Sequence, residues 1–225
     1  MVQSFNPQGI LLSFRAFLSP SLATPHLHLP SIAHISFPAL KRAGIRAIAF
    51  DKDNTLTAPY ADEIWSEFEG GWEECKRVFG RENVCVVSNS LGTPDDPNFT
   101  AEKRIVHPGL GVEVLQHTLK KPAGSDALLA HFSPHPPHTI AFVGDRRLTD
   151  VYYGNLGGLT TILTDAFSFE RDNPVAKRGE GWGGCGKVLE GGAARERGSM
   201  KLYWPLLKGQ QNITAKGWWQ LSGYV

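Results

Sequence analysis

Two aspartates, Asp51 and Asp53, stand one residue apart directly behind the apolar run "IRAIAF". Polar residues also follow two other apolar runs, with Ser88 and Asn89 after "VCVV" and Asp145 after "TIAFVG". Ligands of open parallel sheets bind outside the carboxyl ends of the strands, so we expect these side chains to converge there. Carboxylates at such close range repel one another unless a cation neutralises them or one of them takes up a proton.

The chemistry that suits this set is phosphoryl transfer. Oxygen ligands without a nearby His or Cys favour a hard ion, and Mg²⁺ is typically held by one or two carboxylates. A magnesium site beside a hydroxyl and a lysine can position a phosphoryl group and neutralise its charge. One Asp can then attack phosphorus to form an aspartyl-phosphate. A second carboxyl group two residues on can protonate the leaving oxygen and later deprotonate the attacking water.

The elements that must position these residues alternate along the chain. Strands are expected at 45–50, 84–88, 111–115, 139–145 and 159–164, and helices at 62–80, at 125–132 with Ser125 or Asp126 as cap, and from Thr149 or Asp150 onwards. This alternation predicts an α/β fold: a Rossmann-like parallel sheet of about five strands with helices on both faces. The Pro-, His- and Ser-rich segment 20–38 is expected to be an irregular connector.

The two ends of the chain differ from this middle part. We expect an N-terminal arm over residues 1–40, the catalytic domain over 41–178 and a Gly-rich disordered tail over 179–225. No acidic residue precedes Asp51, which suits a mitochondrial targeting segment or a membrane-surface arm. An apolar stripe at helical spacing in this arm could contact a membrane or pack on the domain; it consists of Ile10, Leu11, Phe14, Phe17 and Leu18.

Charge, cysteine spacing and loop pattern argue against nucleic-acid-binding, disulfide-rich and EF-hand proteins. The 225 residues carry a net charge of +1, which gives no indication of nucleic-acid binding. Cys75, Cys85 and Cys185 form no CxxC pair, so a reducing compartment is expected. A calcium-binding EF-hand loop starting at Asp51 would need Gly at its sixth position, where this chain has Leu56.

Four motifs in order resemble those of the haloacid dehalogenase superfamily. "DKDNT" resembles motif I, "VVSN" motif II, "KKP" motif III and "VGDRRLTD" motif IV. The resemblance covers roughly residues 45–175 and implies a fold of haloacid dehalogenase type. The short connections between the motifs leave no room for a large cap domain.

The resemblance implies a role for each matching residue. Asp51 would be the nucleophile and a metal ligand, and Asp145 a further metal ligand. Asp53 would be the general acid and base, and its main-chain carbonyl group would also face the Mg²⁺.

The remaining residues of the motifs would bind phosphate or support the ligands. Ser88 would bind the phosphate with Asn89 beside it, and Lys121 would balance charge, with Lys120 as the alternative. Asp150 would lie just outside the ligands and hold the lysine or a metal-bound water, and Thr55 would also lie just outside the ligands. Arg146 is expected near the site, where it could contact a second phosphate of the substrate, because Arg suits bidentate phosphate binding.

Within the superfamily, "DKDNTLTAPY", "VSNS", "TLKKPAG", "GDRRLTD" and "DNPVAKR" resemble the mitochondrial phosphatidylglycerophosphate phosphatases. That resemblance implies hydrolysis of phosphatidylglycerophosphate to phosphatidylglycerol, in cardiolipin biosynthesis, by a peripheral protein on the matrix side of the mitochondrial inner membrane. It implies a phospholipid partner and no nucleic acid, and leaves the oligomeric state open. Two alternatives stay open: a capless phosphatase for a soluble phosphomonoester or a nucleic-acid end, and a membrane-docking module without activity.

Overall fold

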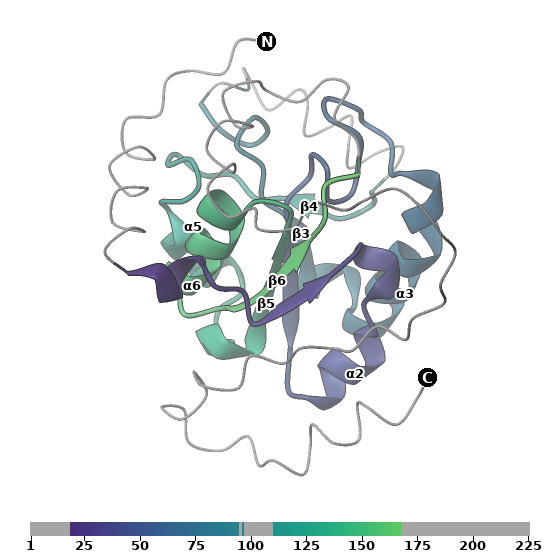
Figure 1. The fold of residues 1–225 in the computed structure, drawn as a ribbon, viewed down its shortest axis with the longest axis horizontal. Helices are drawn as coiled ribbons and strands as arrows, with labels where there is room; N and C mark the ends of the chain where they lie inside the picture. Colours follow the sequence, from purple (N-terminus) through teal and green to yellow (C-terminus); the bar gives the residue numbers. More distant parts are fainter. Residues whose placement is uncertain (1–18, 95, 97–109, 168–225) are drawn as a thin grey trace, which may run out of the picture.

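A parallel sheet of six strands forms the centre of the molecule (Figure 1). The computed structural model describes residues 19–94, 96 and 110–167. The strands are β1 (Leu27–Leu29), β2 (Ala47–Phe50), β3 (Val84–Val86), β4 (Glu113–Val114), β5 (Ile140–Gly144) and β6 (Thr160–Thr164). Their order across the sheet is β1-β6-β5-β2-β3-β4, and every neighbouring pair is parallel. The predicted α/β class is confirmed, with the two central strands β2 and β5 carrying the predicted aspartates at their ends.

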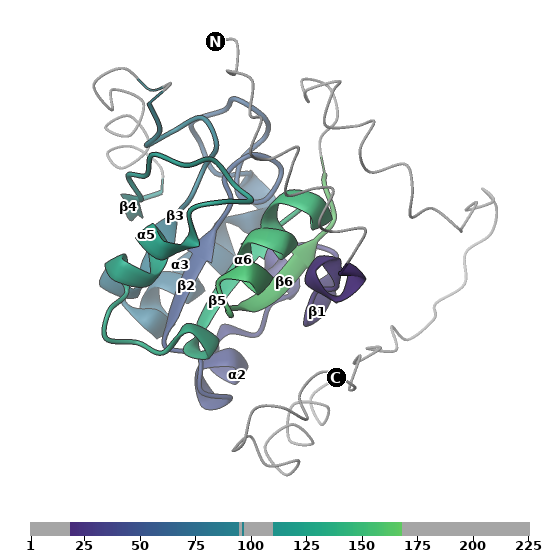
Figure 2. The same cartoon turned by 90° about the vertical axis from the view of Figure 1, so that its left-hand side faces the viewer.

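Helices cover both faces of the sheet, as the alternation of elements predicted. They are α2 (Phe37–Arg42), α3 (Glu69–Phe79), α5 (Ser125–His131) and α6 (Tyr152–Leu156). Shorter helical turns are η1 (Pro20–Ala23), η2 (Ile32–His34), η3 (Ser66–Phe68), η4 (Arg81–Asn83), η6 (Pro137–Thr139) and the π-helical η7 (Arg147–Val151). Turning the molecule by 90° shows α5 and α6 in front of the sheet, with α3 behind it (Figure 2).

Each face has its own hydrophobic core because neighbouring residues of a strand point to opposite sides. Ile48 and Phe50 of β2 pack with Trp72 and other residues of α3, whereas Ala47 and Ala49 pack on the other side with α5 and α6. All four residues of β2 are buried. A strand that is covered on both faces reads as one continuous apolar run, which is why "AIAF" shows no alternation.

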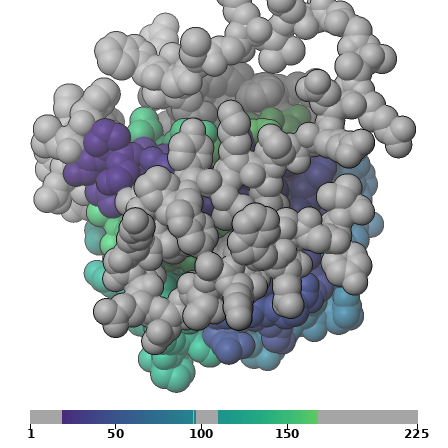
Figure 3. Space-filling model, turned by 60° about the horizontal axis from the view of Figure 1, so that its bottom comes forward, coloured from purple at the N-terminus to yellow at the C-terminus, as the bar shows by residue number. Residues whose placement is uncertain are grey.

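The sheet starts earlier in the chain than the sequence suggested. Segment 20–38, expected to be an irregular connector, contributes the edge strand β1, which pairs with β6 through Leu27 and Ile162. The amide of Asn155 in α6 donates hydrogen bonds to the carbonyl groups of Leu22 and Thr24, at 2.9 Å each. A space-filling view shows the early purple segment lying against green residues from the end of the described chain (Figure 3). The strand was missed because it is only three residues long and lies among Pro and His.

The helix ends also differ from the sequence-based prediction. The residue before α5 is Gly124, with a φ of 81°, and neither Ser125 nor Asp126 caps the helix. Asp150 lies inside η7 and does not precede it. Segment 62–80 becomes helical at Ser66 as η3 and continues as α3.

The apolar stripe of the arm and the Gly-rich tail lie outside the described residues. Among the helices that the structure does describe, none has the length and apolar character needed to span a bilayer. The described connection from β2 to β3 holds η3, α3 and η4 and no additional domain, which agrees with the expected lack of a large cap there.

Candidate active site

The nucleophile predicted by the sequence, Asp51, directly follows β2 at the carboxyl edge of the sheet. Its main-chain N–H donates to the carbonyl of Val143 in the neighbouring strand β5 at 2.8 Å. The chain then turns back, because the carbonyl of Lys52 accepts hydrogen bonds from the N–H groups of Leu56 and Thr57, at 2.9 and 3.0 Å. Asn54, which has a φ of 61°, allows this turn, since Asn tolerates the left-handed region better than most residues.

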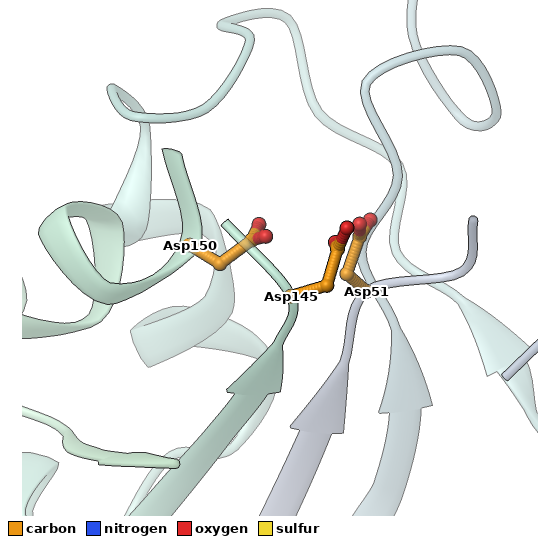
Figure 4. Close-up of side chains that lie close together, drawn as sticks. All are labelled: Asp51, Asp145 and Asp150. Carbon is orange, nitrogen blue, oxygen red and sulfur yellow. The ribbon is translucent and has the colours of Figure 1, made fainter. Parts of the chain in front are cut away.

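Three carboxylates converge at this edge (Figure 4). Asp51 follows β2, Asp145 follows β5, and Asp150 points toward them from η7. Each offers an oxygen atom, and these atoms lie within 4.8 Å of one another. The carboxylate of Asp53, in contrast, does not belong to this cluster.

Lys121 brings a positive charge into the cluster. Its Nζ donates to Oδ1 of Asp51 at 2.6 Å and to Oδ1 of Asp150 at 2.7 Å, and the residue is only 2% exposed. Burial by itself lowers the pKa of Lys121, but Asp150 and Asp51 outweigh burial and raise it, so the lysine is charged. Of the two candidate lysines, the structure therefore places Lys121 between the carboxylates.

The cluster still carries more negative charge than its cations neutralise. Burial, reinforced by Asp150 and Asp51, holds the pKa of Asp145 well above its ordinary value. Burial also raises the pKa of Asp150, with Lys121 opposing it and Asp51 adding to it. Among the described residues, Oδ1 of Asp145 is buried and has no hydrogen-bond partner. A hard divalent cation would satisfy this oxygen and neutralise the excess charge, so the residues present fit Mg²⁺.

Asp53 lies beside the cluster with one of its two carboxylate oxygens held. Its Oδ1 accepts hydrogen bonds from Nζ of Lys52 at 2.9 Å and from the main-chain N–H of Tyr60 at 3.0 Å. Its side chain is 22% exposed, and its Oδ2 accepts no hydrogen bond from the part of the chain described here. This arrangement leaves Oδ2 free to exchange a proton with a substrate or a water.

Ser88 and Asn89 follow β3 at the same edge of the sheet. The hydroxyl of Ser88 accepts from the N–H groups of Ser90 and Leu91, at 3.2 and 3.4 Å, and lies 3.1 Å from the hydroxyl of Ser90, where either oxygen can be the donor. When Ser90 donates, the proton of Ser88 is left for another acceptor. The amide of Asn89 contacts the main chain of Lys121 twice: Oδ1 accepts from its N–H at 2.7 Å, and Nδ2 donates to its carbonyl at 3.2 Å. Asn89 thus fixes the backbone that carries the buried lysine.

Arg146 and Thr55 complete the set that the sequence singled out. Nε of Arg146 lies 3.9 Å from Oδ2 of Asp145, and its main-chain N–H donates to Oδ2 of Asp150 at 3.1 Å. The hydroxyl of Thr55 is buried and has no hydrogen-bond partner among the described residues.

Two residues with contacts at the site were not identified from the sequence. Lys52, only 3% exposed, is bonded to Asp53, and His117 contacts the carbonyl of Ser88 with a ring nitrogen. Lys52 could have been noticed, because a buried lysine between two aspartates reduces their repulsion. His117 gave no such signal, since the eight histidines of the chain show no metal-ligand spacing.

Comparison with known proteins agrees with this geometry. Residues 8–168 match the model of a family described as mitochondrial PGP phosphatase, where PGP denotes phosphatidylglycerophosphate. The chain belongs to this family. The match to the PGP phosphatase family extends over β1 to β6, and so over every residue of the site described above. No solved structure matches the chain.

Curated relatives come from plants, algae and yeast. Phosphatidylglycerophosphate phosphatase 1 of Arabidopsis thaliana, named chloroplastic/mitochondrial, is 37% identical over 168 residues, which are 74% of this chain and 48% of the relative. The chloroplastic phosphatidylglycerophosphate phosphatase 1 of Chlamydomonas reinhardtii is 41% identical over 71% of this chain and 60% of its own length. The mitochondrial phosphatidylglycerophosphatase of Saccharomyces cerevisiae is 31% identical over 68% of this chain and 83% of its own length. The matched part of this chain thus spans about half to 60% of the two photosynthetic relatives.

Proposed function

We propose that this chain is a phosphatase that hydrolyses phosphatidylglycerophosphate to phosphatidylglycerol through an aspartyl-phosphate on Asp51. The observation that carries the proposal is the buried ammonium of Lys121, bonded to both Asp51 and Asp150 beside the unpartnered oxygen of Asp145. Such a site neutralises the charge of a phosphoryl group while a carboxylate attacks it. Membership in a family whose relatives are named for this substrate supports the choice of lipid.

The residues would divide the reaction between them. Oδ2 of Asp51 accepts no hydrogen bond from the described residues, so it is available to attack phosphorus while Lys121 holds Oδ1. The bond from phosphorus to the leaving oxygen breaks as Oδ2 of Asp53 donates a proton to that oxygen. Water then attacks the aspartyl-phosphate and gives a proton to Asp53, which releases inorganic phosphate and restores both carboxyl groups.

The phosphate would be bound by the hydroxyl of Ser88 and the ammonium of Lys121, with Asn89 as a further donor. Asp51, Asp145 and the main-chain carbonyl of Asp53 would hold Mg²⁺, which supplies charge neutralisation at the phosphoryl oxygens. Arg146 would contact the second phosphate of the substrate, because an Arg side chain can bind a phosphate with two parallel hydrogen bonds.

A direct test compares the release of inorganic phosphate from phosphatidylglycerophosphate vesicles with release from p-nitrophenyl phosphate, each with Mg²⁺ or EDTA. We expect Mg²⁺-dependent release with a strong preference for the lipid, and its loss in Asp51→Asn. A preference for the soluble ester would favour the alternative capless phosphatase for soluble substrates. Unchanged activity in Asp51→Asn would refute the mechanism.

The proposed place of action is the matrix face of the mitochondrial inner membrane, where the protein would bind peripherally. This part of the proposal rests on the mitochondrial relatives and on the acidic-free, amphipathic start of the chain. Flotation with cardiolipin-containing liposomes, with and without residues 1–18, tests the contribution of the start. Equal flotation of both proteins would remove the arm from the proposal.

A further inference from the structure

The loop that carries Lys121 lies against the loop that follows β3. The N–H of His117 donates to the carbonyl of Gly92 at 2.8 Å, and the amide of Asn89 spans the main chain of Lys121. The two loops approach so closely that a Cβ added to Gly92, which has a φ of 66°, would lie 2.4 Å from the carbonyl oxygen of Leu115. The position of Lys121 thus depends on contacts between its own loop and the loop after β3, where Asn89 lies 32 residues earlier in the chain.

The ring of His117 adds a contact in the middle of this junction. Its Nε2 lies 2.9 Å from the carbonyl oxygen of Ser88, and its Nδ1 lies 2.7 Å from the carbonyl oxygen of Leu119. His117 is 8% exposed, so water has little access to the ring. A carbonyl oxygen only accepts hydrogen bonds; the neutral ring can donate to one of the two carbonyl groups and the imidazolium to both.

The two carbonyl groups that His117 contacts belong to segments that carry proposed phosphate-binding residues. Ser88 supplies the hydroxyl proposed to bind phosphate, and Leu119 lies two residues before the lysine that holds Asp51. We propose that His117 is a positioning residue that locks the loop carrying Lys121 against the carbonyl of Ser88. The serine hydroxyl and the lysine ammonium then face the same phosphoryl group. The role does not require His117 to touch the substrate, and it rests on the phosphatase activity proposed above.

The variant His117→Phe keeps a ring but removes its hydrogen-bond donor, whereas His117→Gln keeps a side-chain amide that can donate to a carbonyl. Mutation of a residue that orients a metal ligand typically lowers metal affinity or activity 10- to 100-fold, and we take this as the scale for a residue that orients the phosphate-binding lysine. We therefore expect kcat/KM for p-nitrophenyl phosphate to fall by about 10- to 100-fold in His117→Phe. The loss should lie mainly in kcat. A displaced Lys121 would stabilise the charge that develops on the phosphoryl group in the transition state less well, and interactions made in the transition state determine kcat. His117→Gln should recover part of it.

A matched control is offered by His26, which precedes the edge strand β1. The N–H of Thr161 donates to its Nδ1 at 3.0 Å, so the ring holds the start of β6, at the opposite end of the strands from the site. His26→Phe also removes a histidine hydrogen bond, and we expect it to lower the melting temperature without changing kcat/KM. An equal loss of kcat/KM in both Phe variants would overturn the proposal, since it would reflect general destabilisation.

Amide hydrogen exchange provides a readout that is independent of activity. The N–H of Lys121 is protected by its bond to Asn89, and we expect its exchange to accelerate at least tenfold in His117→Phe but not in His26→Phe. Wild-type kcat/KM and wild-type protection in His117→Phe would refute the positioning role. If the wild-type protein hydrolyses no phosphomonoester, the proposed function fails, while the exchange of the Lys121 amide still decides whether His117 locks the loop.

Discussion

Replacement of Lys121 by Met removes a buried ammonium and keeps a side chain of similar length. The three carboxylates of Asp51, Asp145 and Asp150, with oxygens within 4.8 Å of one another, then lose the cation that is bonded to two of them. Two like charges about 4 Å apart repel by about 4 kcal/mol at an effective dielectric constant of 20. Breaking a buried ion pair by removing one partner costs about 3–5 kcal/mol.

We therefore expect Lys121→Met to lower the free energy of unfolding by about 3–5 kcal/mol in EDTA at neutral pH. The loss is a large part of the roughly 5–15 kcal/mol that stabilises a typical domain. Mg²⁺ should recover part of it, because a cation bound by the same carboxylates replaces the missing charge. A ligand at 100 times its dissociation constant adds about 2.7 kcal/mol. Turnover should remain absent in both conditions, since the lysine is needed at the phosphoryl group.

Urea denaturation of the wild type and Lys121→Met, with EDTA or excess Mg²⁺, measures these differences. The matched control is Lys120→Met, which removes the neighbouring half-buried lysine and should change the free energy of unfolding by less than about 1 kcal/mol. The double variant Lys121→Met with Asp150→Asn removes one charge of each sign and should be more stable than Lys121→Met alone. The reasoning is refuted if Lys121→Met in EDTA unfolds within about 1 kcal/mol of the wild type.

Three further predictions follow from the same region. Asp145→Asn should raise the free energy of unfolding in EDTA, because it relieves repulsion by Asp51 and Asp150, and should weaken Mg²⁺ binding at least tenfold in calorimetric titration; unchanged affinity would exclude Asp145 as a ligand. Gly144→Ala should reduce kcat strongly, because the added Cβ would lie 2.4 Å from Cβ of Asp150 and displace that carboxylate; wild-type kcat would show that Asp150 can shift without loss. Burial lowers the pKa of His117 below its unfolded value of 6.5, with Lys121 and Lys120 adding to this effect and two carbonyl groups opposing it. The unfolded chain therefore binds the proton more readily, so this contribution to stability is complete above pH 6.5 and is lost as the pH falls through the folded pKa. Between pH 7.5 and pH 5.5 the wild type should lose more unfolding free energy than His117→Phe, and equal losses in urea titrations would contradict the shift.

The sheet could be predicted because its strands are buried on both faces and therefore appear as uninterrupted apolar runs. β2, β3, β5 and β6 each lie within the range expected from the sequence. β1 could not be predicted, because it is only three residues long and pairs with β6, a strand far along the chain; Leu27 lies opposite Ile162. The prediction that Asp150 caps a helix was wrong because a contact with a distant residue determines its position. Asp150 lies within the π-helical turn η7, and its carboxylate accepts a hydrogen bond from Lys121.

Motif order predicted which residues gather at the edge of the sheet, but it did not predict how each side chain is used. The side-chain amide of Asn89 accepts a hydrogen bond from the main-chain N–H of Lys121 at 2.7 Å and donates one to its carbonyl at 3.2 Å. Only one N–H of the amide is therefore left for a phosphate. Its main contribution is therefore to the backbone of the lysine, 32 residues further on. The lysine must remain charged and immobile next to two carboxylates, and neither property follows from its own position in the sequence. Its charge depends on Asp150 and Asp51, which raise its pKa against the effect of burial. Its backbone position depends on the contact of its loop with Asn89 and, as proposed above, on the ring of His117.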